Sequence, residues 1–440
     1  MASSTIDPPI STSDAQCLAD YQAALLAYQT YFGDPVEHID RALERQPDFV
    51  LGHVFRAIAL AALAERRFAA QALPSLEAAE ALVDAANGRE QGLIRAAREL
   101  LDGRWEQACQ RFDDVLVAYP RDAFALQTAH LIDFLRGDAL NLRNRVARVL
   151  PNWGADDAGY SYVLGMYAFG LEECNQYELA EEYGRRALEV DARDPWSVHA
   201  VTHVMEMQGR MAEGIEFLES RNADWAPDNA FAYHNWWHLC LFYLDGDNVD
   251  QVLRIYDEQI QPDAGSFAMG LVDITALLWR LRLLGVDVGD RFEFAADKWG
   301  AHLDQEGGFY AFNDFHAALA FAGAGRDEPL ARVVALAEQA AERGIPTNQR
   351  MEADVGLPLV RGVQAYAQGR FNDAADTLAA VRDVAHRFGG SHAQRDVISL
   401  TLIDAAARAG RRGAAQHFLN EREMFKPASE MGRRLLHNAA

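Results

Sequence analysis

The stretch NQYELAEEYGRRALEVDARDPW, residues 175–196, decides the fold. Its apolar residues recur every three to four positions, which is the spacing of one face of an α-helix. Ala180 and Ala187 belong to that face and are small enough to let a second helix approach closely. The pattern stops at Asp191, and Pro195 cannot continue a helix but suits the first turn of the next one. The stretch therefore predicts one helix, a tight turn and the beginning of another helix.

The same arrangement recurs along most of the chain. Phe68, Trp105, Tyr177 and Met211 each follow a short polar turn and begin an alanine-rich amphipathic stretch, and they are separated by 37, 72 and 34 residues. The middle interval corresponds to two units. Helical hairpins that recur about every 34 residues are the signature of tetratricopeptide repeats. We therefore predict an all-α fold, an α-solenoid of about ten such hairpins that forms a right-handed superhelix.

The pattern also suggests domain boundaries. We expect a disordered N-terminal segment over residues 1–14 and a single helical-repeat domain over residues 15–425. The repeat spacing is looser between about 260 and 360, where the units should be irregular. Residues 426–440 are expected to form a C-terminal tail.

Composition and charge narrow the choice of partners. The 440 residues include 41 basic and 65 acidic side chains, for a formal net charge of −24. Such a field repels nucleic-acid phosphates and anionic lipids. The N-terminus lacks the features of a secretory signal, and the four cysteines are scattered, as in proteins that keep reduced thiols. We expect a cytoplasmic protein that binds neither nucleic acid nor membranes.

Five strings carry a resemblance to a known family. They are YVLGMYAFGLEE (162–173), HAVTHVMEMQGR (199–210), HNWWHLCLFYLDGD (234–247), YAFNDFHAALAF (310–321) and GGSHAQRDV (389–397). The chain resembles a bacterial-type member of the tetratricopeptide repeat protein 38 family from about residue 90 to about residue 425. This resemblance implies a helical-repeat fold. It does not imply a defined chemical activity.

Two His-x-x-x-His pairs are the main candidate site. His199 and His203 lie one helical turn apart, and so do His234 and His238. Both pairs precede a turn glycine, so we place them on the first helices of adjacent hairpins, which line the concave groove of a tetratricopeptide solenoid. Imidazoles from both helices could converge on zinc or another first-row divalent ion. Ordinary packing of histidine and tryptophan between hairpins is an equally serious interpretation.

Further polar residues could join the groove. Glu206 continues the column of the first histidine pair, and Trp237 lies inside the second pair. Asn313, Asp314 and His316 could supply ligands or an acid–base group, although caps and hydrogen-bonding spacers have the same appearance.

A third region lies near the end of the chain. Ser391 is a plausible helix N-cap there. Arg395 could hold a carboxylate or phosphate, or could pair with an acid within the protein.

Two functions remain open from the sequence. The first is a binding scaffold whose His-, Glu- and Trp-rich concave groove holds a peptide, a protein segment or a small molecule. The second is a metal-dependent, hydrolase-like enzyme on the same scaffold, with Glu206 or Asp314 as general base. Phosphate-loop, nucleophile-elbow and zincin motifs are missing from the sequence, so no residue is assigned as catalytic and an enzymatic activity stays undecided.

Overall fold

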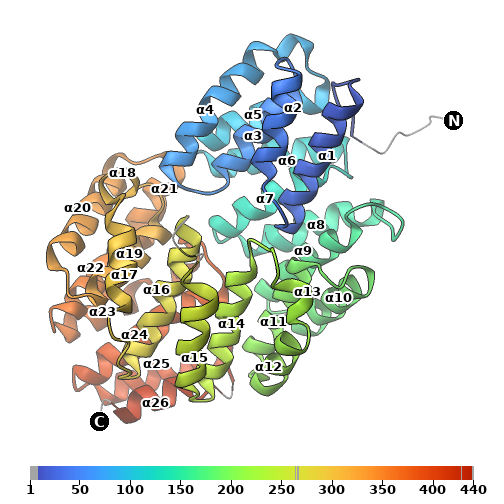
Figure 1. Ribbon diagram of the computed structural model, residues 1–440. Helices are drawn as coiled ribbons and strands as arrows, with labels where there is room; N and C mark the ends of the chain where they lie inside the picture. Colours follow the sequence, from blue (N-terminus) through green and yellow to red (C-terminus); the bar gives the residue numbers. More distant parts are fainter. Residues whose placement is uncertain (1–7, 263, 265–266, 428, 439–440) are drawn as a thin grey trace. The chain divides into compact units, whose positions relative to one another are not determined.

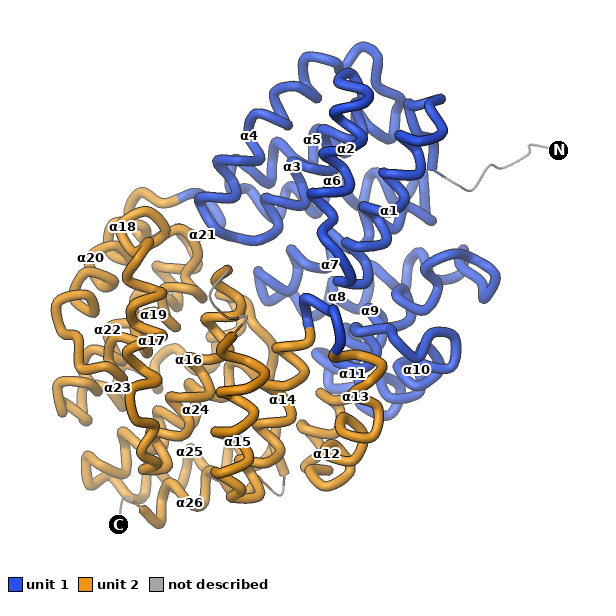
Figure 2. Tube along the Cα trace, viewed as in Figure 1, with its two compact units in different colours: residues 1–201, 227–231, 345–347 blue, residues 202–226, 232–344, 348–440 orange. Residues whose placement is uncertain are grey.

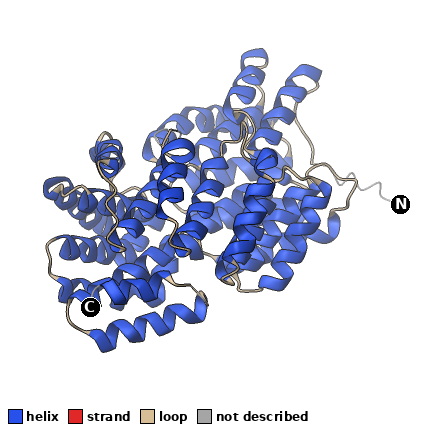
Figure 3. Ribbon diagram, turned by 60° about the horizontal axis from the view of Figure 1, so that its bottom comes forward, coloured by secondary structure: helices blue, strands red, loops and turns tan. Residues whose placement is uncertain are grey.

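Helices make up both compact units of the protein. The computed structural model describes residues 8–262, 264, 267–427 and 429–438 (Figure 1). Unit 1 contains residues 1–201, 227–231 and 345–347, and unit 2 contains residues 202–226, 232–344 and 348–440 (Figure 2). Among the described residues there is no strand, only an isolated bridge between Phe32 and Asn229 in unit 1. The all-α prediction is confirmed (Figure 3).

Ten helices lie within the described part of unit 1, and an eleventh, α11, spans Pro195–Met207 and crosses the boundary. The ten are α1 (Ala15–Thr30), α2 (Pro35–Arg45), α3 (Val50–Ala61), α4 (Arg66–Ala81), α5 (Gly88–Leu101), α6 (Trp105–Ala118), α7 (Ala123–Leu135), α8 (Ala139–Val149), α9 (Tyr160–Glu173) and α10 (Tyr177–Val190). Short 3₁₀ turns follow α4 and α8.

Unit 2 continues with α12 to α26. These are α12 (Met211–Ser220), α13 (Asn222–Trp225), α14 (Ala232–Asp245), α15 (Val249–Ile255), α16 (Ala268–Leu283), α17 (Arg291–Gly300), α18 (Leu303–Glu306), α19 (Ala311–Gly323), α20 (Asp327–Arg343), α21 (Pro346–Met351), α22 (Leu357–Ala367), α23 (Phe371–Val381), α24 (His392–Arg408), α25 (Arg412–Phe425) and α26 (Met431–Asn438). The first residues of α21 are assigned to unit 1. Single π-helical turns follow α15 and α21, and the 3₁₀ segment Arg382–Phe388 follows α23.

Consecutive helices pack as hairpins. In the described chain this holds for α1–α2, α3–α4, α5–α6, α7–α8, α9–α10, α14–α15, α16–α17, α19–α20, α22–α23 and α24–α25. Because each pair is joined by a short turn, its helices run in opposite directions. These are helical hairpins of the tetratricopeptide type, as the 34-residue spacing predicts. The right-handed superhelix remains a prediction.

The opening stretch folds as its sequence indicates. Helix α10 ends at Val190 and α11 begins at Pro195, after Asp194, whose carboxylate accepts hydrogen bonds from the backbone amides at the start of α11. Ala180 and Ala187 are fully buried. Gly184 also allows the two helices to lie close together, because a Cβ atom there would lie 2.6 Å from Val201 Cγ2. Small residues on α10 therefore set its close approach to α11.

The turns between paired helices require left-handed backbone. Gly209, Gly369 and Gly410 have φ values of 72°, 73° and 75°, as expected for glycine between helices. After α14 the left-handed residue is Asp247, with φ 63°, and not Gly246. Aspartate tolerates this conformation better than most residues that carry a Cβ atom, so Asp247 can take it in place of the turn glycine.

Both ends of the described chain are better anchored than the sequence suggests. Residues 1–7 of the predicted disordered segment lie outside the described residues. Within residues 8–14, the backbone amide of Ser11 donates to Glu90, and Asp14 caps α1. At the other end, the predicted tail contains α26 and the buried Ser429. The polar groups at both ends form specific hydrogen bonds with residues far away in sequence, and a repeat pattern does not reveal such partners.

No helix in the described part of the chain is both long and apolar enough to cross a lipid bilayer.

Candidate functional site

Three imidazoles converge inside unit 2. His203 comes from α11, and His234 and His238 come from α14. One ring nitrogen from each lies within 4.8 Å of the others. The ring centroids of His203 and His238 are 4.4 Å apart, and those of His234 and His238 are 4.8 Å apart. We call these three residues the histidine cluster. All three are buried, so they do not line an open groove as expected from the sequence.

Carboxylates orient two of the three rings. Nδ1 of His234 lies 2.6 Å from Oδ2 of Asp273, and Nδ1 of His238 lies 2.8 Å from Oε2 of Glu206. Each Nδ1–H donates to its carboxylate, and in a neutral ring this leaves the lone pair on Nε2. The pKa of His238 lies well below its usual value, because of burial and then because of the other two imidazoles and the nearby cations. His238 is therefore neutral at pH 7.

Glu206 begins a buried chain of charged and polar side chains. The ammonium of Lys426 donates to Glu206 Oε1 and lies 3.6 Å from Asp396. Asp396 accepts two hydrogen bonds from Arg422, at 2.7 and 2.8 Å, and Arg422 also donates to Ser429. We call Glu206, Lys426, Asp396, Arg422 and Ser429 the polar chain. Burial alone would raise the pKa of Asp396, but Arg422 and Lys426 outweigh it and lower that pKa.

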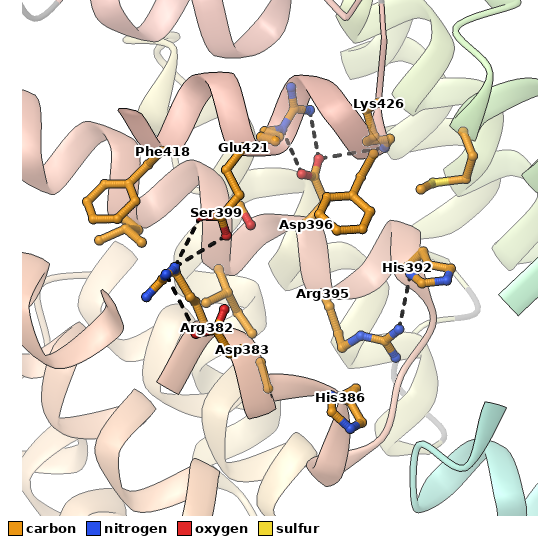
Figure 4. A pocket seen from close by; sticks show the side chains of 16 residues that line it. Arg382, Asp383, His386, His392, Arg395, Asp396, Ser399, Phe418, Glu421 and Lys426 are labelled. Atoms are coloured by element: carbon orange, nitrogen blue, oxygen red, sulfur yellow. Dashed lines mark hydrogen bonds and ion pairs between the residues drawn. The ribbon is translucent and has the colours of Figure 1, made fainter. Parts of the chain in front are cut away.

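A pocket in unit 2 adjoins the polar chain. The cavity has a volume of about 300 Å³ and lies among the 3₁₀ segment 382–388, α24 and α25 (Figure 4). Asp396 and Lys426 are part of its wall. His386, His392 and Arg395 gather along one edge of the cavity, where the Arg395 guanidinium lies 3.3 Å from His392 Nδ1 (Figure 4). We call these three residues the cationic edge after the Arg395 guanidinium, which carries its positive charge.

The beginning of α24 holds the cationic edge in place. Ser391 caps this helix through a reciprocal pair of hydrogen bonds with Gln394, so the prediction of an N-cap at Ser391 is confirmed. Gly390, with φ 75°, precedes the cap, and its carbonyl oxygen accepts a hydrogen bond from Arg395. The partner of Asp396 is Arg422, so the acid next to Arg395 in sequence is already held by another arginine.

Two further predicted residues, His199 and Trp237, belong to α11 and α14. His199 lies one turn before His203 on α11 but belongs to unit 1, where its ring contacts those of Phe169 and Phe231, each at 5.1 Å. Its role as a metal ligand remains a prediction. Trp237 stacks on His234 at 5.3 Å and has the guanidinium of Arg280 5.4 Å from its ring centroid.

The predicted residues of α19 form a separate group. Asp314 accepts a hydrogen bond from the backbone amide of Gly308, and it raises the pKa of buried Glu352, for which burial is the larger cause. His316 is fully buried, and its Nδ1 donates to the carbonyl oxygen of Phe312 at 2.8 Å. Asn313 is partly exposed on the same helix. The histidine cluster therefore forms without the three candidates of α19.

Several partners of the site were missed by sequence reasoning. Lys426 was assigned to a tail, and Arg422 and Asp396 were not expected to be buried together. Asp273 and Arg280 gave a usable signal, because each is a charged residue within the otherwise apolar stretch MGLVDITALLW and its continuation. A charge in such a stretch is costly unless it is paired, and so it indicates a buried partner.

Comparison with known proteins finds distant structural likenesses only. No family model matches the chain. Yeast Tom70 is 13% identical over 95% of this chain and 92% of its own, with a TM-score of 0.43. A human IFIT1 dimer with PPP-AAAA is 14% identical over 96% of this chain and 100% of its own, with a TM-score of 0.43. The TPR domain of P58(IPK) is 15% identical over 92% and 98%, with a TM-score of 0.22. The hairpins themselves define a tetratricopeptide-type helical-repeat protein.

Proposed function

We propose that this protein is a helical-repeat binding scaffold whose unit-2 pocket captures the anionic group, a carboxylate or a phosphate, of a small molecule or a peptide. The observation that carries this proposal is the cationic edge of His386, His392 and Arg395 along a cavity of about 300 Å³. That volume is at the lower end of the range for small-molecule sites. The Arg395 guanidinium, which also donates to the carbonyl oxygen of Gly390, is a chemical group that suits such anions.

The local charge supports this choice of ligand. Burial lowers the pKa of His386, and Arg395 and the neighbouring Arg387 and His392 lower it further, as a positive potential does. The three acids of the pocket are already paired: Asp396 with Arg422, and Glu421 and Asp383 both with Arg382, at 3.3 and 3.6 Å. The positive charge of Arg395 therefore stands beside acids that already have cationic partners.

The test is a binding titration with defined probes. Inorganic phosphate and succinate are titrated calorimetrically into the full chain and into an Arg395→Met variant. Arg361→Met is the matched control, because Arg361 lies on α22 with its side chain 53% exposed and paired with Glu338. The proposal expects one probe to bind wild type and the control alike and to bind Arg395→Met at least tenfold more weakly. Equal binding by all three proteins, or no binding of either probe to wild type, contradicts it.

The alternative, a metal-dependent hydrolase-like enzyme, has less support from the geometry. A catalytic zinc site keeps one position open for water or substrate. His203 and His238 are 0% exposed, which favours an enclosed site. The two proposed bases are also engaged, since Glu206 accepts hydrogen bonds from His238 and Lys426, and Asp314 accepts one from Gly308.

We also propose that the chain is a bacterial-type member of the tetratricopeptide repeat protein 38 family and that it acts in the cytoplasm. The strings quoted above support the family, and the order of hairpins is compatible with it. The net charge of −24 supports partners other than nucleic acid and anionic membranes. A gel-shift titration with single-stranded RNA tests the charge argument, which binding at physiological salt would contradict.

A further inference from the structure

We propose that unit 2 contains a site for one divalent first-row transition-metal ion, best suited to zinc, formed by His203, His234 and His238. This site is separate from the anion pocket and does not depend on the function proposed for it. Three imidazoles are a common protein ligand set for zinc. They come from α11 and α14, and the members nearest in sequence from different helices, His203 and His234, are 31 residues apart.

The hydrogen bonds select the ligand atoms. Asp273 holds Nδ1 of His234 at 2.6 Å, and Glu206 holds Nδ1 of His238 at 2.8 Å. With Nδ1 protonated in this way, Nε2 is the nitrogen that can donate its lone pair to a metal. A carboxylate behind a histidine also fixes the orientation of the ring and makes it a stronger ligand. An arrangement of carboxylate, histidine and metal is thus prepared twice in the same cluster.

The distances need only modest adjustment. Zinc–nitrogen bonds are about 2.0–2.1 Å long, so the ligand nitrogens must approach one another more closely than the 4.8 Å that bounds them here. The ligand set contains no thiolate and no oxygen donor, which suits zinc, copper or nickel better than magnesium or calcium.

A buried histidine in the same unit shows the contrast with ordinary packing. His316 is also 0% exposed, but its Nδ1 donates to a backbone carbonyl and it lies outside the cluster. The partners of His234 and His238 are instead the carboxylates of Asp273 and Glu206, and each of these side chains is about 1% exposed. Two buried acids therefore orient two neighbouring imidazoles, an arrangement that His316 lacks.

The experiment measures metal binding directly. Full-length protein without a histidine tag is stripped with a chelator, offered zinc sulfate, passed through gel filtration and analysed for metal content. Zinc affinity is then measured by competition with a chromophoric chelator. Wild type is expected to retain one zinc per chain and His238→Gln to lose it. His316→Gln, the matched control, should bind zinc as wild type does.

Asp273 is a positioning residue and provides a second test. Asp273→Asn keeps the shape of the side chain but weakens its hold on His234, so zinc affinity should fall 10–100-fold. This variant keeps the proposal testable where circular dichroism shows that His238→Gln does not fold. Cobalt offered in place of zinc should give wild type the intense visible absorption of a tetrahedral site. The proposal is overturned by a wild type that retains no metal, or by cluster variants that bind zinc as tightly as wild type.

Discussion

Removing one member of the buried pair of Asp396 and Arg422 should cost far more stability than removing both. The two side chains are 7% and 3% exposed and share two hydrogen bonds of 2.7 and 2.8 Å. Asp396→Leu leaves the Arg422 guanidinium buried without its carboxylate, which should lower the free energy of unfolding by about 3–5 kcal/mol. Arg422→Met should cost a similar amount for the same reason. The double variant should lie within about 1 kcal/mol of wild type or above it, because an apolar pair avoids the loss of hydration.

The assay is a double-mutant cycle in urea, which leaves ionic strength unchanged. Urea unfolding gives the free energies, and hydrogen–deuterium exchange in α24 and α25 shows whether the loss is local. Arg370 and Asp373 form an exposed ion pair on α23 and serve as the control cycle, for which the coupling should stay below about 1 kcal/mol. Additive single variants, with coupling at Asp396 and Arg422 no larger than in the control, would refute the buried-pair argument.

Three further outcomes are expected. Gly170→Ala should destabilise unit 1 by about 1–3 kcal/mol, because a Cβ atom there would lie 2.6 Å from the backbone of Leu142. Thermal unfolding measures the loss of stability, and an unchanged melting temperature would contradict the prediction. Burial lowers the pKa of His130 and His316 to about 3 from 6.5, so stability present above pH 6.5 should be lost as the pH falls towards 3. At pH 5 each of these two histidines should lower the free energy of unfolding by about 2 kcal/mol. A urea midpoint that stays constant from pH 7 to pH 5 would contradict this pH dependence. Ser391→Ala should cost about 1 kcal/mol and speed hydrogen exchange at the start of α24, whereas unchanged exchange there would argue against the cap.

Local sequence was sufficient for the helices and many of their ends. The residues that stop α10 and begin α11 act on their own backbone, so the stretch from 175 to 196 could be interpreted without knowledge of the rest of the chain. The capping box at Ser391 is local in the same sense. The turn after α14 shows the limit of this approach, because either Gly246 or Asp247 could adopt the left-handed conformation, and it is Asp247 that does.

The candidate site also has features that local sequence predicts and features that depend on tertiary packing. The sequence placed the histidine pairs on helices, which are α11 and α14, and α14 is the first helix of the hairpin α14–α15. It could not show that His203 and His238 are enclosed, because burial depends on elements far along the chain. Lys426, which donates to Glu206, is 220 residues away from it, and no periodic pattern connects them. The pocket has the same origin, since α24, α25 and the 3₁₀ segment 382–388 bound it only after they pack.

The sequence by itself determined the all-α class, the hairpin repeat and the positions of the paired histidines, because these follow from contacts between residues three or four positions apart. Only the tertiary structure decided that Asp273 and Glu206 orient the imidazoles, that Asp396 pairs with Arg422, and that the last residues complete unit 2. Such pairings join charges that cannot be buried alone, and their partners are chosen by how whole helices pack. A periodic pattern specifies which face of a helix is buried but not which distant side chain meets it there.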